Sequence, residues 1–137
     1  MKDLDWSNLS FGYRQTDYNV RCYYRNGKWG EIEVCSDEYL KLHMAATCLH
    51  YGQEAFEGLK AYRCPDGKVR VFRMDENAAR LQSTCRGIMM PEVPTEMFEE
   101  MVKKVVRLNQ EWIPTYESGA TLYIRPLLIG TSAQVGV

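Results

Sequence analysis

Residues 49–63 constrain the fold of this chain more than any other stretch. They read Leu-His-Tyr-Gly-Gln-Glu-Ala-Phe-Glu-Gly-Leu-Lys-Ala-Tyr-Arg, and the two glycines free the backbone for turns and close approaches. The first part is typical of a short helical turn, and the residues from Leu59 onward favour a strand. Tyr51 and Phe56 lie at this junction, where aromatic side chains commonly line a small-molecule pocket. Spacing alone favours ordinary core residues for both, and leaves the pocket as the other interpretation.

The β-branched and aromatic residues predict four strands, over residues 20–24, 29–34, 59–63 and 69–73. Asn26 and Gly27 would join the first two strands as a hairpin, because Asn-Gly is a strong two-residue turn signal. A Pro-Asp-Gly turn at residues 65–67 would join the other two. We expect an irregular lead-in over residues 1–19 and a short turn of helix over residues 39–44.

Two amphipathic helices are predicted after the second hairpin. The first covers residues 76–86 with Asp75 as its N-cap, and its core stripe is Ala78, Leu81 and Cys85. The second covers residues 96–112 with Thr95 as its N-cap and ends before Pro114. Its core stripe is expected to contain Phe98, Met101, Val102, Val105, Asn109 and Trp112.

The last predicted element is a single buried strand over residues 120–130, which holds one charge, Arg125. A charge in such a run must be paired or must serve a ligand, and the sequence leaves both roles open. Pro126 cannot donate to a sheet, so we expect an edge or a bulge there. The order of elements predicts an α+β fold, in which helices pack on an antiparallel β-sheet.

Composition excludes several classes of function. The chain has 137 residues, enough for one domain, which we place over residues 1–137. A net charge of -1 argues against a nucleic-acid surface or a polybasic membrane patch, and no apolar run is long enough for a membrane span. The five cysteines form no C-x-x-C and the histidines have no zinc-ligand spacing, so we expect reduced thiols, no metal and a cytoplasmic location.

Five segments resemble, in order, segments of the branched-chain aminotransferases, which are pyridoxal-phosphate (PLP) enzymes of fold type IV. They are residues 50–62, 69–73, 77–81, 109–114 and 122–130. The resemblance implies the small domain of a D-amino-acid-aminotransferase-like fold. It also implies that the full enzyme transfers the amino group of leucine, isoleucine or valine to 2-oxoglutarate, forming glutamate, and that it assembles as a homo-oligomer, a dimer or larger.

The resemblance also implies roles for individual residues. Arg80 matches the arginine that holds the PLP phosphate, which suits a planar guanidinium. The residues that match the family's substrate site are Tyr51, Phe56, Tyr123 and Arg125, and Phe11 is expected to join them. The aromatic rings would surround the branched side chain, and the polar groups would help to place a carboxylate. Val135 and Val137 match a loop that reaches the neighbouring subunit.

No lysine of this chain matches the lysine that forms the family's Schiff base with PLP, which is expected beyond Val137. The sequence therefore looks like an N-terminal small domain, and we expect it to be inactive alone. Two alternatives remain. One is another enzyme of the same fold type, a D-amino-acid aminotransferase or an aminodeoxychorismate lyase. The other is a non-catalytic binding module derived from the small domain.

Overall fold

The computed structural model describes residues 4–5 and 11–135, and these form an α+β fold, as predicted. In the described part of the chain, every paired strand runs antiparallel to its neighbour. The strands are β1 (Asn19–Arg21), β2 (Tyr24–Arg25), β3 (Lys28–Trp29), β4 (Glu33–Cys35), β5 (Glu54–Phe56), β6 (Leu59–Arg63), β7 (Val69–Val71), β8 (Leu122–Ile124) and β9 (Leu127–Ile129). The helices are α1 (Thr47–Tyr51), α2 (Met74–Gly87) and α3 (Thr95–Leu108), with 3-10 turns η2 (Gln110–Trp112) and η3 (Tyr116–Ser118).

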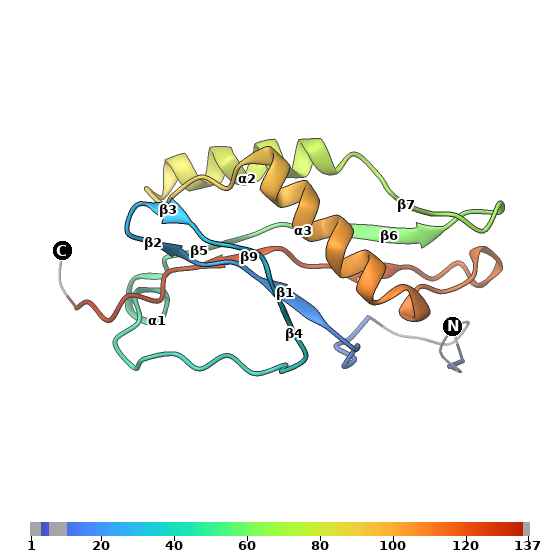
Figure 1. The fold of residues 1–137 in the computed structure, drawn as a ribbon, viewed down its shortest axis with the longest axis horizontal. Helices are drawn as coiled ribbons and strands as arrows, with labels where there is room; N and C mark the ends of the chain where they lie inside the picture. Colours follow the sequence, from blue (N-terminus) through green and yellow to red (C-terminus); the bar gives the residue numbers. More distant parts are fainter. Residues whose placement is uncertain (1–3, 6–10, 136–137) are drawn as a thin grey trace.

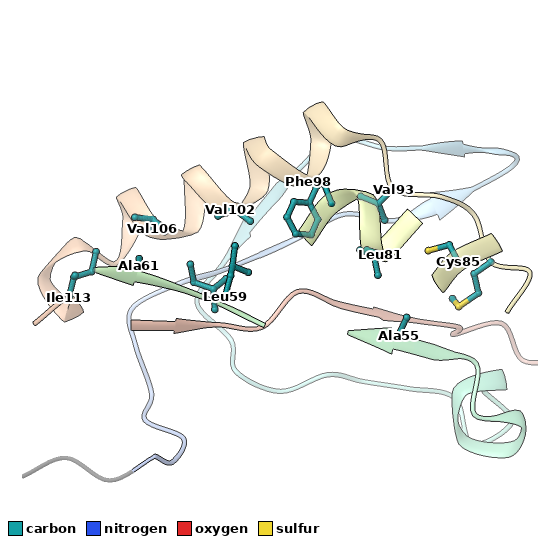
Figure 2. Close-up of a cluster of buried hydrophobic side chains, with 13 residues drawn as sticks. Ala55, Leu59, Ala61, Leu81, Cys85, Val93, Phe98, Val102, Val106 and Ile113 are labelled. Carbon is teal, nitrogen blue, oxygen red and sulfur yellow. The ribbon is translucent and has the colours of Figure 1, made fainter. Parts of the chain in front are cut away.

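Helices α2 and α3 lie together on one side of strands β5, β6 and β9 (Figure 1). The core fills the space between these layers. Phe98, Val102 and Val106 of α3 point toward Leu59 and Ala61 of β6 (Figure 2). The core stripe predicted for the second helix did not include Val106, which is buried. Met101 and Val105, which it did include, are only partly buried.

The first hairpin is confirmed, but its strands are shorter than predicted. Asn26 and Gly27 have φ angles of 54° and 81°, as the twisted two-residue turn requires. Each predicted strand is split in two, because β2 pairs with β3 whereas β1 pairs with β4. The second hairpin, β6 with β7, is also confirmed, although β7 ends at Val71.

The short helix predicted over residues 39–44 is not formed, whereas the helical turn expected at the start of residues 49–63 is present as part of α1. Residues 39–43 are irregular, and the helix is α1, at Thr47–Tyr51. The first backbone N–H groups of a helix have no partner inside it. Here Thr47 and Cys48 donate to the carbonyls of Ser132 (3.2 Å) and Gly130 (2.9 Å). The distant C-terminal segment therefore fixes where α1 begins, and Gly52, with a φ of 61°, ends it.

The two longer helices differ from prediction at their ends. The stripe Ala78, Leu81 and Cys85 of α2 is buried as predicted, but the residue at its N-cap is Arg73, with a φ of 50°, and Asp75 lies in the first turn. Thr95 is the first residue of α3 rather than its cap, and its hydroxyl accepts from Gln82 Nε2 at 3.0 Å. No helix within the described ranges is long and apolar enough to cross a membrane.

Helix α3 stops at Leu108 because Asn109 closes it. The Asn109 side chain is 3% exposed, and its Nδ2 donates to the carbonyls of Val105 (2.8 Å) and Tyr18 (2.9 Å). Its Oδ1 accepts from the backbone N–H groups of Asp17 and Tyr18, both at 3.0 Å. Asn109 thus ties the N-terminal lead-in to the end of α3, and Trp112 falls in η2 instead of in the predicted stripe.

The predicted single strand over residues 120–130 is wrong. It is two strands with different partners, since β8 pairs with β6 and β9 pairs with β5. The break lies at Arg125 and Pro126, consistent with the expected interruption at a residue that has no N–H. A matching break on the other chain segment lies at Glu57 and Gly58, and the Glu57 N–H donates to the Pro126 carbonyl at 3.0 Å.

Candidate functional site

The backbone around these two breaks carries side chains on both faces of the sheet. Side chains alternate between the faces of a strand, and this alternation continues from Ala55 to Ala61 through the break. Ala55, Glu57 and Leu59 are buried on the side of the helices, whereas Phe56 is 58% exposed. Phe56 and Glu57 therefore point in opposite directions, and each belongs to a separate group of residues.

On the open face, four residues form what we call the aromatic–arginine cluster: Phe11, Phe56, Tyr123 and Arg125. The guanidinium carbon of Arg125 lies 4.2 Å from the Phe56 ring centroid and 5.3 Å from that of Tyr123. Arg125 Nε and Nη2 donate to the Tyr123 hydroxyl at 3.2 and 3.0 Å. Phe11 meets the Tyr123 ring edge to face, with centroids 5.2 Å apart. The structure thus brings together residues that are up to 114 positions apart in sequence.

Gly58 makes room for this arrangement. A β-carbon on Gly58 would lie 3.0 Å from Cζ of Tyr123 and closer still to its hydroxyl oxygen. The Tyr123 ring therefore rests on bare backbone at the break between β5 and β6. This is the close approach for which a glycine in residues 49–63 was expected.

Arg125 has an exposed guanidinium and, within the described residues, no carboxylate partner. The described residues therefore do not supply the structural ion pair that the sequence had left open. Two rings and one hydroxyl hold the cation in place while leaving other N–H donors directed to solvent. Such an arrangement can bind a carboxylate, and the Tyr123 hydroxyl can donate a further hydrogen bond beside it.

On the helix face, Glu57 is 5% exposed and is bound by two side chains of α2. Arg80 donates from Nε to both carboxylate oxygens at 2.9 Å and from Nη2 to Oε1 at 2.7 Å. Asn77 Nδ2 donates to Oε1 at 3.0 Å. The Glu57 carboxylate raises the pKa of the Arg80 guanidinium above its ordinary value, through the hydrogen bonds first and the charge second. Arg80 itself is 66% exposed, so this ion pair is buried at one end and open at the other.

The remaining expected site residues lie around α1. Tyr51 is the last residue of α1, is half exposed, and its ring centroid lies 6.4 Å from that of His50. Val135 is exposed. The segment just before Val135 is held against the residues that precede α1, because Gln134 donates its N–H to the Ala45 carbonyl at 3.2 Å. Val137 lies outside the described residues.

Glu57, Gly58 and Asn77 were not identified as site residues from the sequence. A signal for Glu57 was present, because it occupies a position in an alternating row with Ala55, Leu59 and Ala61. A carboxylate in an apolar row needs a cation close by. The partner could not be found in this way, since Arg80 lies 23 positions away on a different element.

Curated relatives match this chain over its whole length. A branched-chain-amino-acid aminotransferase from Haemophilus influenzae is 52% identical over 100% of this chain and 40% of that protein. A protein of the same description from Helicobacter pylori is 45% identical over the same shares. The chain thus spans about two fifths of the length of these relatives. No model of a protein family matches it.

Solved structures agree with the sequence comparison. The branched-chain amino acid aminotransferase from Escherichia coli superposes with a TM-score of 0.61 at 28% identity, over 86% of this chain and 36% of that one. Another enzyme of this description, solved in complex with N-(5'-phosphopyridoxyl)-L-glutamate, also gives a TM-score of 0.61, at 26% identity. That match covers 88% of this chain and 36% of the other. Along its whole length in sequence, and over most of its length in fold, the chain is therefore similar to about two fifths of the length of the branched-chain aminotransferases.

Proposed function

We propose that this chain forms one wall of the active site of a PLP-dependent branched-chain aminotransferase. The complete enzyme would transfer the amino group of leucine, isoleucine or valine to 2-oxoglutarate. The observation that carries this proposal is the exposed Arg125, held by Phe56 and Tyr123 and without a carboxylate partner in the described residues. The 52% identity to the Haemophilus influenzae protein supports the choice of reaction.

The aromatic–arginine cluster would bind the substrate. Arg125 and the Tyr123 hydroxyl would hold a carboxylate, which amino acids, 2-oxo acids, glutamate and 2-oxoglutarate share. Phe56, with Tyr51 at the end of α1, would surround the branched apolar side chain and exclude water from it. Phe11 would fix the orientation of the Tyr123 ring from its edge, and so the direction of its hydroxyl.

Arg80 would hold the cofactor through its phosphate. The donor set fits such a group, since Glu57 takes Nε and one side of Nη2, while the exposed end of the guanidinium keeps Nη1 for an anion. When bound, PLP supplies an electron sink that lets the substrate Cα lose and regain a proton. None of this chain's lysines matches the one that the resemblance assigns to that chemistry, and we propose that the rest of the full-length protein provides it.

We further propose that the chain is the small domain of that protein, and that the protein is a cytoplasmic homodimer or larger oligomer. Tyr51, Phe56 and Leu127 are exposed apolar groups, and Val135 in the C-terminal segment is 71% exposed. Exposed groups of this kind favour contact with another domain or subunit. Reduced cysteines are typical of the cytoplasm, and the described cysteines are all free.

The test uses the full-length protein, by which we mean this chain continued to the length of its relatives. It is obtained from its own gene or by joining this chain to the remaining part of the Haemophilus influenzae protein. With PLP and 2-oxoglutarate, we expect glutamate from leucine, isoleucine and valine but not from D-alanine. The chain alone should form no more glutamate than free PLP does. Turnover of D-alanine alone would indicate a D-amino-acid aminotransferase, and cofactor binding without any turnover would indicate a binding module.

A further inference from the structure

Glu57 is a buried carboxylate whose presence is not explained by stability. It stands in a row with Ala55 and Leu59, between the sheet and the helices, and is 5% exposed. Removing a carboxylate from water is costly, and replacing a buried ion pair by apolar residues of similar size is often neutral or stabilising. An apolar residue in this row would complete the core without needing a partner.

What the carboxylate does achieve is to fix one exposed side chain. Arg80 is a long side chain on the surface of α2, and when unrestrained it would sample many rotamers. Three hydrogen bonds of 2.7–2.9 Å to Glu57 hold the plane of the guanidinium. Glu57 is itself held, by Asn77 Nδ2 at 3.0 Å and by its backbone N–H on the Pro126 carbonyl. The edge of the guanidinium that carries Nε and Nη2 is held by Glu57, and this sets the direction of the exposed edge.

We infer that Glu57 is a positioning residue that orients Arg80 toward the cofactor phosphate, with Asn77 holding Glu57 in turn. This inference rests on the proposed function, because it needs the phosphate of PLP as the anion. A guanidinium presents its donors in one plane, so fixing the edge on Glu57 also fixes the direction of the free edge. The energetic benefit is that Arg80 loses little conformational freedom when the phosphate arrives.

Glu57 also has an effect in the opposite direction, so the direction of the change in PLP affinity on its removal separates the two effects. A carboxylate beside Arg80 partly neutralises the cation and thereby weakens its attraction for any anion. If neutralisation dominates, removal of the carboxylate tightens phosphate binding. If positioning dominates, removal weakens it, and only for a ligand that carries a phosphate.

The experiment measures dissociation constants of the full-length apoprotein for PLP and for pyridoxal, which lacks the phosphate, by absorbance titration. Glu57→Gln is expected to weaken PLP binding by about tenfold and pyridoxal binding by less than about twofold. Asp66→Asn is the matched control, because Asp66 also pairs with an arginine, Arg70, but on the exposed hairpin turn between β6 and β7. It should leave both constants unchanged.

A double-mutant cycle tests whether Glu57 acts through Arg80. Combined with Arg80→Ala, the Glu57→Gln change should cause no further loss of PLP affinity, because the arginine that it orients is gone. Asn77→Ala keeps both charges and removes the hydrogen bond to Glu57 together with a longer one, of 3.4 Å, to the Gly58 carbonyl. It serves if Glu57→Gln does not fold. We expect a smaller loss, about threefold, again specific to PLP.

Three results would overturn the inference. They are unchanged or tighter PLP binding in Glu57→Gln, an equal loss for PLP and pyridoxal, and additive losses in the double mutant. If the unaltered full-length protein does not bind PLP more tightly than pyridoxal, the proposed cofactor itself is wrong. A failure at that first step is therefore distinguishable from a failure of the role assigned to Glu57.

Discussion

The Tyr123 ring packs directly on the backbone of Gly58, with so little room between them that a β-carbon would lie 3.0 Å from the ring's Cζ atom. This contact sets the position of the Tyr123 hydroxyl, which accepts both hydrogen bonds from Arg125. The geometry of the aromatic–arginine cluster therefore depends on the absence of a side chain at one position in the chain.

Gly58→Ala should displace the Tyr123 ring. We expect it to cost about 1–3 kcal/mol of unfolding free energy, measured by urea denaturation, because an added methyl group in a packed contact forces its neighbours apart. Gly87→Ala is the control. Gly87 is the last residue of α2, has open space around its Cα, and should tolerate or gain from alanine in the helix. Equal effects of the two substitutions would show that Tyr123 does not depend on Gly58.

Asn109→Ala should destabilise the fold by about 2–4 kcal/mol, since it removes the acceptor of two backbone N–H groups and leaves buried polar groups unsatisfied. The neighbouring Gln110→Ala changes an exposed side chain and should have little effect. Thermal unfolding of the two variants checks this. A loss in Asn109→Ala no larger than that in Gln110→Ala would mean that the lead-in is not anchored as we describe.

Burial of the Cys85 thiol should make the free energy of unfolding depend on pH in alkaline solution. The Cys85 side chain is 0% exposed, and burial raises the pKa of its thiol above its ordinary value. Below about pH 8.5 the thiol is neutral in both states, so its contribution is fully present. As the pH rises further, the unfolded chain ionises first, and the contribution is lost as the pH passes through the folded pKa. The stability difference between the unaltered chain and Cys85→Ala should therefore shrink as the pH rises above about 8.5, whereas a constant difference would contradict burial of this thiol.

Much of the fold could be predicted because its signals are local. The Asn26-Gly27 turn and the stripe Ala78, Leu81 and Cys85 depend on residues within one element, and both are as predicted. The helix ends were less predictable. Arg73 and Pro94 stand at the N-caps in place of Asp75 and Thr95, and neither makes a side-chain capping hydrogen bond.

The failures in the placement of α1 and of the last strand involve contacts between distant segments. Helix α1 starts where the C-terminal segment meets Thr47 and Cys48, and no pattern near residue 47 encodes that. The strand over residues 120–130 is split because β5 and β6 offer it two separate partners. In the candidate site, single residues were identified by resemblance, but the contact of Arg125 with Phe56 and that of Arg80 with Glu57 depend on the tertiary fold.

The substrate role of Arg125 is tested most directly by the Michaelis constants of the full-length protein. Arg125→Gln removes the charge that we propose binds the substrate carboxylate. Arg70→Gln is the matched control, since Arg70 is an exposed arginine paired with Asp66 on the hairpin. We predict that Arg125→Gln raises the KM for leucine and for 2-oxoglutarate by about 10- to 100-fold, as expected for a lost charge-assisted contact, while Arg70→Gln leaves both unchanged. If Arg125→Gln and Arg70→Gln have the same KM values as the unaltered protein, the aromatic–arginine cluster is not the substrate site.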